Sequence, residues 1–236
     1  MLGYYRITGL IVKMDTFGRT FNQACPYSIE NECEPDIIIS SNWVSRKNEY
    51  IMLSDDDGEY LSTGINFYKQ LISRDGLMLH SSCVVVDGRA YLFAANSGTG
   101  KSTHTGLWLK QFRDRAFILN DDKPAVRLEE GVWYAYGTPW SGKHDISVNA
   151  RVPVAGIACL ERGEINEIEP FSGRDAVLAL LRQCNRPKAA EYRIKLLELL
   201  DKLITQVPVW KLKCNMDPEA AIVSYEAMSG CKFEEN

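Results

Sequence analysis

The fold of this chain is indicated most clearly by one stretch, Ala94-Ala95-Asn96-Ser97-Gly98-Thr99-Gly100-Lys101-Ser102-Thr103. It follows an apolar run at 90–94 that is typical of a strand, and it precedes a run from Ser102 that is typical of a helix. A glycine-rich turn with Lys-Ser at a strand-to-helix junction is the pattern of a loop that wraps phosphates. The glycines allow several N–H groups to face one point, to which the helix adds the positive end of its dipole.

The residue types in this stretch suit a nucleoside triphosphate. Lys101 can reach the β- and γ-phosphates, and the Ser102 hydroxyl can hold Mg²⁺. Ala95 stands where the usual pattern has Gly, so the loop has to begin without a left-handed residue. A chance Gly/Ser turn is the alternative interpretation. The residues that we expect to bind the nucleotide are Ser97, Gly98, Thr99, Gly100, Lys101, Ser102 and Thr103.

Two adjacent carboxylates, Asp121 and Asp122, form the second candidate feature. They follow four residues, 117–120, that predict a buried strand, and ligands bind at the carboxyl ends of strands in open α/β sheets. Phosphoryl transfer needs a carboxylate near Mg²⁺ and a group that orients the acceptor hydroxyl or takes its proton. We expect Asp121 to share the metal with Ser102 and Asp122 to act as the base. The residues leave this division of roles open, and a turn cap is the alternative.

Repulsion between these acids predicts that one titrates high, unless Mg²⁺ or Lys101 offsets it. The three histidines lie near the motifs. His80 could tune the acidic pair or relay a proton, or it could be a core histidine. We expect His104 to lie along the helix after the loop, as a structural residue or as a neighbour of the nucleotide base. Lys143 and His144 could clamp a phosphate or the acceptor, and a solvated loop is equally compatible.

The composition narrows the class of protein. With 236 residues, 45% hydrophobic and 25% charged, the chain can form one sizeable globular core. The net charge of −4, with scattered basic residues, argues against a nucleic-acid partner. The seven cysteines form no Cys-x-x-Cys pair, so neither zinc nor a redox pair is indicated. No signal peptide or membrane-spanning run is recognised, so we expect a cytoplasmic protein without a membrane partner.

The remaining pattern predicts one compact α/β unit, with a β-rich N-terminal portion at 1–75 packed on a core at 76–236. Helices flank a central sheet in this reading. The expected strands are 4–13, 36–40, 50–53, 77–80, 83–86, 89–94, 117–120, 125–128, 132–136, 154–161 and 209–212. The expected helices are 63–73, 102–112, 173–183, 189–204 and one that begins near Asp217, and 55–58 is expected to be a turn between strands.

Three segments together resemble a known family: Ser97-Gly98-Thr99-Gly100-Lys101-Ser102, Leu79-His80 before a strand pair, and Asn120-Asp121-Asp122. They are similar to the catalytic domain of HPr kinase/phosphorylase, which shares its kinase-type phosphate loop with ATP-dependent phosphoenolpyruvate carboxykinase. The resemblance covers 76–135 well and extends loosely to about 186. It implies a central mixed sheet with the nucleotide at its edge, ATP and Mg²⁺ as cofactors, and a serine hydroxyl as acceptor.

Carried over by position, Lys101 and Ser102 bind phosphate and Mg²⁺, Asp121 and Asp122 supply metal and base functions, and His80 lies beside the pair. The family's Glu-x-x-Gly-x-Gly metal signature is absent, and residues 136–143 occupy about that place. The N-terminal segment is also unlike the larger regulatory domain of the bifunctional enzymes. The chain therefore resembles the small stand-alone relatives, some of which phosphorylate serine in modified-peptide pathways.

The resulting hypothesis is an ATP- and Mg²⁺-dependent kinase that phosphorylates a hydroxyl, serine of a peptide or protein. HPr itself is not the expected acceptor, and phosphorylase activity stays open. Two alternatives are a nucleotide-binding regulatory or assembly protein without phosphotransfer, and a small-molecule kinase. The choice of ATP over GTP and the presence of a homo-oligomer are not decided by the sequence.

Overall fold

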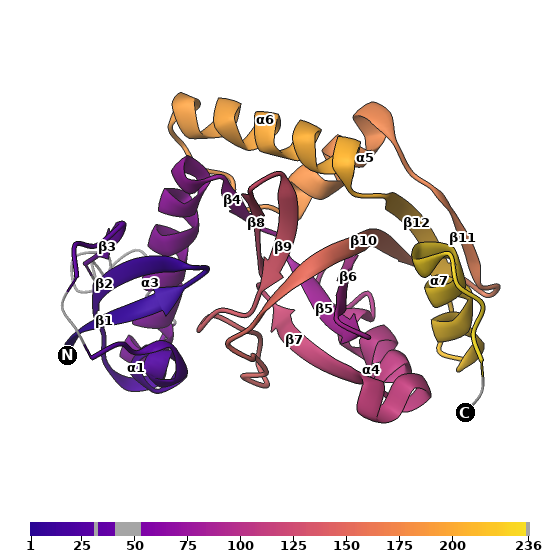
Figure 1. Ribbon diagram of the computed structural model, residues 1–236, viewed down its shortest axis with the longest axis horizontal. Coiled ribbons are helices and arrows are strands. Elements are labelled where there is room, and N and C mark those ends of the chain that lie inside the picture. Colours follow the sequence, from indigo (N-terminus) through magenta and orange to yellow (C-terminus); the bar gives the residue numbers. More distant parts are fainter. Residues whose placement is uncertain (31–32, 41–52, 235–236) are drawn as a thin grey trace.

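The computed structural model describes residues 1–30, 33–40 and 53–234. Within these ranges, nine strands form the larger sheet, in the order β4-β8-β9-β10-β6-β5-β7, with β12 paired to β10 and β11 to β12 (Figure 1). These strands are β4 (Gly76–Met78), β5 (Ser81–Val86), β6 (Arg89–Ala94), β7 (Ala116–Asp122), β8 (Ala125–Glu129), β9 (Val132–Tyr136), β10 (Arg151–Arg162), β11 (Glu167–Pro170) and β12 (Val209–Cys214).

The strand directions place four carboxyl ends at one edge of this sheet. Strand β10 is parallel to both β6 and β12, whereas β5 is antiparallel to both of its neighbours, β6 and β7. Strands β6, β7, β10 and β12 therefore point the same way, and the beginning of β5 lies between the ends of β6 and β7. A mixed α/β sheet with flanking helices is what the sequence predicts.

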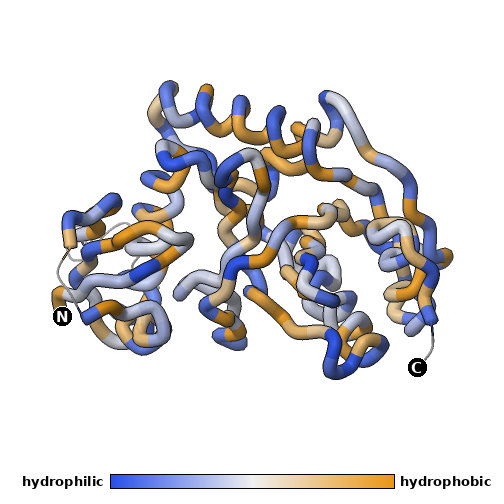
Figure 2. The backbone as a smooth tube through the Cα atoms, in the orientation of Figure 1, coloured by the Kyte–Doolittle hydropathy of each residue, from blue (hydrophilic) through white to orange (hydrophobic). Residues whose placement is uncertain are grey.

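Helices cover both faces of the sheet because its central strands are apolar on both sides. On β5, Val84 and Val86 pack in the cluster with α4 (Lys101–Phe112) and α7 (Glu219–Ser229). The alternating Cys83 and Val85 pack in the cluster with α5 (Gly173–Arg182) and α6 (Ala190–Gln206). Figure 2 shows hydrophobic and hydrophilic residues alternating along the turns of α6, as expected for a helix with one buried face.

The first 75 residues contain a smaller sheet and two helices. Strands β1 (Leu2–Ile7) and β2 (Leu10–Asp15) are antiparallel, and β3 (Ile37–Ile39) runs parallel to β2. Helices α1 (Gly18–Ala24) and α3 (Asp55–Leu71) pack beside them (Figure 1). The expectation of a β-rich portion is therefore only partly right. Short 3-10 turns occur at η1 (Cys25–Tyr27), η3 (Ile72–Arg74) and η4 (Arg113–Arg115).

The expected turn at 55–58 is wrong, because these residues form the first turn of α3. The Ser54 side chain accepts a hydrogen bond from the Asp57 N–H at 3.1 Å and so caps the helix. The acidic residues 55–57 suit the positive end of the helix dipole. The helix therefore begins at Asp55 rather than at Thr63.

Other boundaries differ from the expected ones for local reasons. The run 4–13 is two strands, because Thr8 and Gly9 have positive φ and form a hairpin turn. The last helix, expected to begin near Asp217, begins at Glu219 with Pro218 at the cap position. Residues 50–52 of one expected strand lie outside the described residues. Helix α1 and strand β11 were not predicted.

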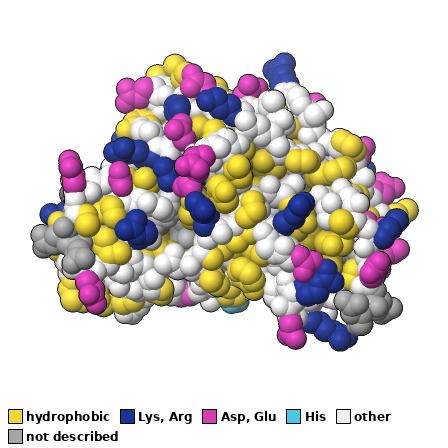
Figure 3. Space-filling model, in the orientation of Figure 1, with side chains coloured by type: hydrophobic (Ala, Val, Ile, Leu, Met, Phe, Trp, Pro, Cys, Tyr) yellow, Lys and Arg dark blue, Asp and Glu magenta, His cyan; other side chains and the backbone are white. Residues whose placement is uncertain are grey.

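The surface agrees with the dispersed charge of the sequence. On the face drawn in Figure 3, Lys and Arg side chains lie among Asp and Glu side chains instead of in one patch. None of the helices in the described ranges combines the length and hydropathy needed to cross a bilayer.

Candidate active site

The candidate site lies where the ends of β6 and β7 meet the beginning of β5. Ser81, the first residue of β5, pairs with Ala94 on one side and with Asp122 on the other. The glycine loop (residues 95–100) leaves β6 here, and both aspartates end β7 here. The topology therefore brings together two motifs that the sequence places about 20 residues apart.

The glycine loop has the backbone conformation that its composition predicts. Gly98 and Gly100 have φ of 78° and 121°, which side chains rarely adopt, so glycine is required for conformation at both positions. Ala95 is 5% exposed and packs in the apolar cluster under α4. It is not among the described residues with positive φ, so the departure from the usual glycine causes no strain there.

Lys101, in the first turn of α4, contacts both the glycine loop and His80. Its Nζ lies 3.0 Å from the Ala95 carbonyl oxygen and 3.1 Å from His80 Nε2. Burial lowers the pKa of this ammonium, and the charges of Asp122 and Asp121 partly oppose that effect. The lysine is thus held at the loop, beside the acidic pair.

Ser102 and Asp121 form the next contact. The Ser102 hydroxyl lies 3.0 Å from each carboxylate oxygen of Asp121 and donates one hydrogen bond to this group. A hydroxyl and a carboxylate are oxygen ligands of the kind that Mg²⁺ prefers. No group of three or more His, Cys, Asp or Glu side chains that could hold a metal occurs among the described residues. These two side chains could hold a magnesium ion, which would then take its other ligands from phosphate and water.

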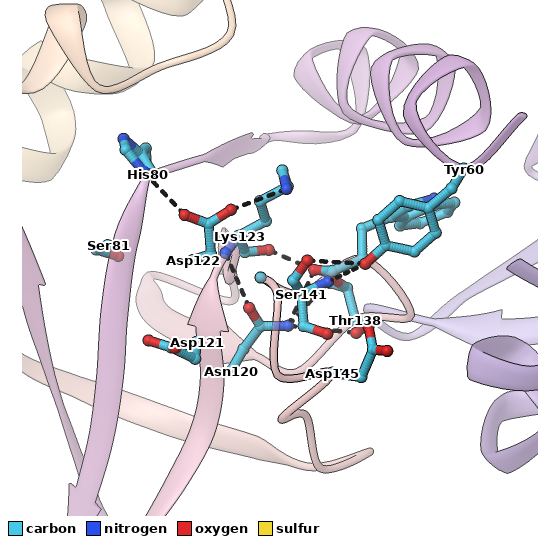
Figure 4. Close-up of polar contacts among 12 residues, drawn as sticks. Tyr60, His80, Ser81, Asn120, Asp121, Asp122, Lys123, Thr138, Ser141 and Asp145 are labelled. Carbon is cyan, nitrogen blue, oxygen red and sulfur yellow. Dashed lines mark hydrogen bonds and ion pairs between the residues drawn. The ribbon is translucent and has the colours of Figure 1, made fainter. Parts of the chain in front are cut away.

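Asp122 is held on both of its carboxylate oxygens (Figure 4). His80 Nε2 lies 2.9 Å from Oδ1, and Lys123 Nζ lies 2.8 Å from Oδ2. Burial would raise the pKa of this carboxyl, but these two contacts outweigh it and hold the pKa well below its usual value. The repulsion that was expected to raise one pKa of the pair is offset for Asp122 by His80 and Lys123.

These residues border a cavity of about 570 Å³. The loop between β9 and β10 (residues 137–150) closes one side of it. The Gly142 N–H donates to the Asp121 carbonyl oxygen at 2.6 Å, which brings Lys143 and His144 to the cavity wall. Its lining residues are His80, Ser97, Gly98, Gly100, Lys101, Ser102, Thr103, Asp121, Asp122, Gly142, Lys143 and His144.

Three contacts at the site were not anticipated from the sequence. Lys123 directly follows the acidic pair, and this adjacency is the one signal that could have suggested it. Gln183 Oε1 accepts from His80 Nδ1 at 3.2 Å, and Gln183 Nε2 donates to Asn96 Oδ1 at 3.1 Å. Gly142 meets Asp121 and Arg19 from distant points in the sequence, so no local pattern marks these two contacts.

Other candidates lie outside the cavity. His104 is buried, its Nε2 is 3.1 Å from Ser224 Oγ, and burial lowers its pKa to about 4, which favours the structural one of its two expected roles. Trp140 is buried and stacks on Phe67 with 4.8 Å between ring centroids, so it is a core residue. Arg162 donates to the carbonyl oxygens of Gly98 and Thr99.

Comparison with known proteins gives the family of the chain and a solved structure with a similar fold. The model of a family described as "ScmC: SynChlorMet cassette protein ScmC" matches residues 54–219, more than half of the chain, and the chain therefore belongs to this family. A search of curated proteins finds no match. Among solved structures, the fold is similar to "Structure of the Hpr(Ser) kinase/phosphatase from Coxiella burnetii", with 12% identity and a TM-score of 0.38, over 65% of this chain and 95% of that chain.

Proposed function

We propose that this protein is an ATP- and Mg²⁺-dependent kinase that transfers the γ-phosphoryl group to a serine hydroxyl of a peptide or protein. One observation supports this most: Lys101, Ser102 and both aspartates line a single cavity of about 570 Å³ beside a glycine loop at a helix N-terminus. Each of these groups has a role in phosphoryl transfer, and all of them already line the same cavity.

In this proposal the chain binds the phosphates before it orients the acceptor. The loop N–H groups and the end of α4 surround the phosphates, and Lys101 contacts the β- and γ-oxygens. Ser102 and Asp121 would hold Mg²⁺, which when bound neutralises charge on the β- and γ-phosphates. His80 contacts both Lys101 and Asp122. It thereby fixes the position of the phosphate-binding lysine relative to the carboxylate that orients the acceptor.

Asp122 then acts on the acceptor. The serine oxygen bonds to the γ-phosphorus while the bond from phosphorus to the ADP oxygen breaks, and the hydroxyl proton passes to the Asp122 carboxylate. Because its pKa is held low, Asp122 is a weak base, and its main contribution is orientation of the hydroxyl for in-line attack. The supply of ATP in the cytoplasm makes that compartment the proposed location.

A second candidate function is that of a regulatory protein that binds ATP without transferring phosphate. The set of acidic side chains at the cavity favours it. Asp121 and Asp122 are the acids that line the cavity within the described part of the chain, and the Glu-x-x-Gly-x-Gly signature is absent. A protein that binds ATP as a conformational ligand, without transfer, needs no further metal ligand. A small-molecule kinase would use the same core and differ in its acceptor.

One experiment separates these functions. The full chain is incubated with γ-labelled ATP and Mg²⁺, with either a serine-centred degenerate peptide library or a small-metabolite extract, while calorimetry measures Mg·ATP binding. Label on peptides supports the proposal, and label on a metabolite supports a small-molecule kinase. Binding without transfer supports the regulatory protein.

The matched variants are Lys101→Ala and Lys110→Ala, two lysines of the same helix. We expect Lys101→Ala to weaken Mg·ATP binding at least about tenfold, the range for a lost charged hydrogen bond. The exposed Lys110 should leave binding unchanged. Equal affinity in both variants, or no binding by the wild-type chain, would contradict the proposal.

A further inference from the structure

The N-terminal portion contributes none of the described residues that line the cavity, since all of these lie at His80 or beyond. It nevertheless contacts the β9–β10 loop (137–150), which carries Lys143 and His144 to the cavity wall. Trp140 of this loop donates from Nε1 to the Thr63 hydroxyl at 3.2 Å. The loop is therefore shaped by residues that precede the site in sequence.

Tyr60, on α3, holds the backbone of this loop at Ser141 (Figure 4). The buried tyrosine hydroxyl accepts from the Ser141 N–H at 2.6 Å and donates to the Ser141 carbonyl oxygen at 2.8 Å. Two bonds from one hydroxyl to one residue fix the backbone of Ser141 at the peptide groups on both of its sides.

Arg19, on α1, holds the next residues. Its guanidinium lies over the Tyr60 ring, 4.1 Å from the centroid. It donates to the Gly142 carbonyl oxygen at 3.0 Å and to Asp145 Oδ1 at 2.6 Å. These two contacts lie on either side of Lys143 and His144.

Gly142 connects the part of the loop that Arg19 holds to the acidic pair. Its N–H bonds to the Asp121 carbonyl oxygen, while its carbonyl bonds to Arg19. A Cβ on Gly142 would lie only 3.0 Å from Asp122 Cβ, so the loop passes directly against the proposed acceptor-orienting residue. The β9–β10 loop and the glycine loop therefore line the same cavity, and Asp122 lines it as well.

Lys143 and His144 are exposed and have no hydrogen-bond or ion-pair partner in the described ranges. Asp145, the nearest acid in the sequence of this loop, is already paired with Arg19 at 2.6 Å. Within the described part of the chain, Lys143 is therefore a cation on this wall without a paired acid. A carboxylate of the incoming substrate is its complementary group.

We propose that Arg19 and Tyr60 are positioning residues that hold Lys143 and His144 as the acceptor wall of the cavity, and that this wall selects peptides with an acidic residue beside the acceptor serine. The inference rests on the proposed kinase function and names its substrate class. The nucleotide meets the glycine loop, Lys101 and Ser102, so its affinity does not depend on Arg19.

The test compares two serine-centred peptide libraries, one with Asp and Glu at the flanking positions and one with neutral residues there. For the full-length wild-type chain we expect about a fivefold higher kcat/KM with the acidic library, the upper range for a partly exposed ion pair. We expect Arg19→Gln to reduce this preference to about one, with Mg·ATP affinity within about twofold of wild type. A general loss of stability would lower both rates without changing their ratio.

Arg151→Gln is the matched control. Arg151 also stacks on a tyrosine, 4.4 Å from the Tyr134 centroid, and pairs with Glu129 at 2.9 Å, but it does not line the cavity. It should keep the wild-type preference. A wild-type chain without preference for acidic peptides, or an Arg19→Gln variant that keeps it, would overturn the inference. So would an equal loss of Mg·ATP affinity and peptide rate in Arg19→Gln, or a wild type that binds Mg·ATP and labels neither library.

Hydrogen exchange on the unliganded chain tests the positioning step alone. In Arg19→Gln, faster exchange at the Ser141 and Gly142 amides with unchanged exchange over 96–100 supports positioning by Arg19. Unchanged exchange at both segments contradicts it. Failure of the wild-type chain to bind Mg·ATP would instead defeat the proposed function and the substrate class with it, so the two failures are distinguishable.

Discussion

Asp122 ends strand β7 with φ of 96°, a conformation that costs a non-glycine residue on the order of 1–3 kcal/mol. Such residues persist where their surroundings hold them, and here His80 and Lys123 each contact one carboxylate oxygen. The strained backbone and the paired carboxylate together set one direction for this side chain. That is the requirement for a residue that orients a hydroxyl.

Replacement of this carboxylate should separate binding from transfer. We expect Asp122→Asn to keep Mg·ATP affinity within about threefold and to lower the rate of transfer by about 100-fold or more, the range for loss of acid–base assistance. Calorimetry and transfer of label from γ-labelled ATP measure the two quantities. The exposed Asp114→Asn serves as control. Should Asp122→Asn transfer at the wild-type rate, the assignment of Asp122 is wrong.

Glu59 is a second acid with an unusual environment, and it is not among the residues that line the cavity. Its side chain is fully buried in α3, and burial raises its pKa from 4.5 to about 7, although bonds from the Thr20 hydroxyl and the Phe17 N–H oppose the shift. The folded state thus binds this proton more tightly than the unfolded state. The associated stability is present below pH 4.5 and is lost as the pH rises through about 7.

The glutamine variant removes this ionisation and keeps an acceptor for Thr20. We expect the free energy of unfolding of the wild type to fall between about pH 6 and pH 8 relative to that of Glu59→Gln. Urea unfolding at three pH values within this range measures the difference. Parallel profiles of the two proteins would show that Glu59 does not titrate there.

Among the elements, α3 connects the N-terminal portion to the β9–β10 loop. Its first turn is capped by Ser54, and its middle contacts Trp140 of the β9–β10 loop. Gly64 is the residue that permits this approach, since a Cβ there would lie 2.9 Å from Trp140 Cδ1. Intrinsic helix propensity would favour alanine at this position, so packing decides the residue.

Two helix glycines give opposite expectations. Gly64→Ala should lower the free energy of unfolding by about 1–3 kcal/mol through overpacking against Trp140. Gly106→Ala in α4, where a Cβ would meet no atom within 4 Å, should raise it by about 0.5–1 kcal/mol. Thermal and urea unfolding compare the two. Stabilisation by both substitutions would contradict the close packing of α3 on this loop.

At the scale of the whole molecule, the smaller and larger sheets share one apolar cluster. It joins Phe67 and other residues of the N-terminal portion to Ala125, Tyr136 and Trp140 of the rest of the chain. Tyr68 adds a polar contact, from its hydroxyl to the Lys123 carbonyl oxygen at 2.5 Å. Separation of the two parts would expose this cluster to water.

This shared cluster predicts cooperative unfolding. Urea transitions followed by far-UV circular dichroism and by tryptophan fluorescence should coincide at a single midpoint. Two resolved transitions, with the N-terminal portion unfolding first, would show that the cluster contributes little to its stability. The same measurement on Trp140→Phe, which keeps an aromatic ring there, controls for the loss of the indole hydrogen bond.

Local signals predicted much of the fold and part of the candidate site. The β5–β6 hairpin, the glycine loop and α4 were predicted because glycines, turn residues and helical spacing act within a few residues of one another. The beginning of α3 was missed although Ser54 and Asp57 form a capping pair, because three adjacent acids also suit a turn. Distant residues meet where Gly142 contacts Asp121 and where Arg19 binds the β9–β10 loop. No local pattern in the sequence predicts such contacts.

The sequence by itself determined the chemistry at hand: a glycine loop with Lys101 and Ser102, and an acidic pair at the end of an apolar strand. Backbone conformation and side-chain type are local properties, so these features follow from the order of residues alone. Only the tertiary structure decided that His80 lies between Lys101 and Asp122, and that the N-terminal portion holds the wall carrying Lys143. Both depend on strand order and on contacts between residues that are 21 to 123 positions apart in the sequence, where burial of apolar surface selects the arrangement.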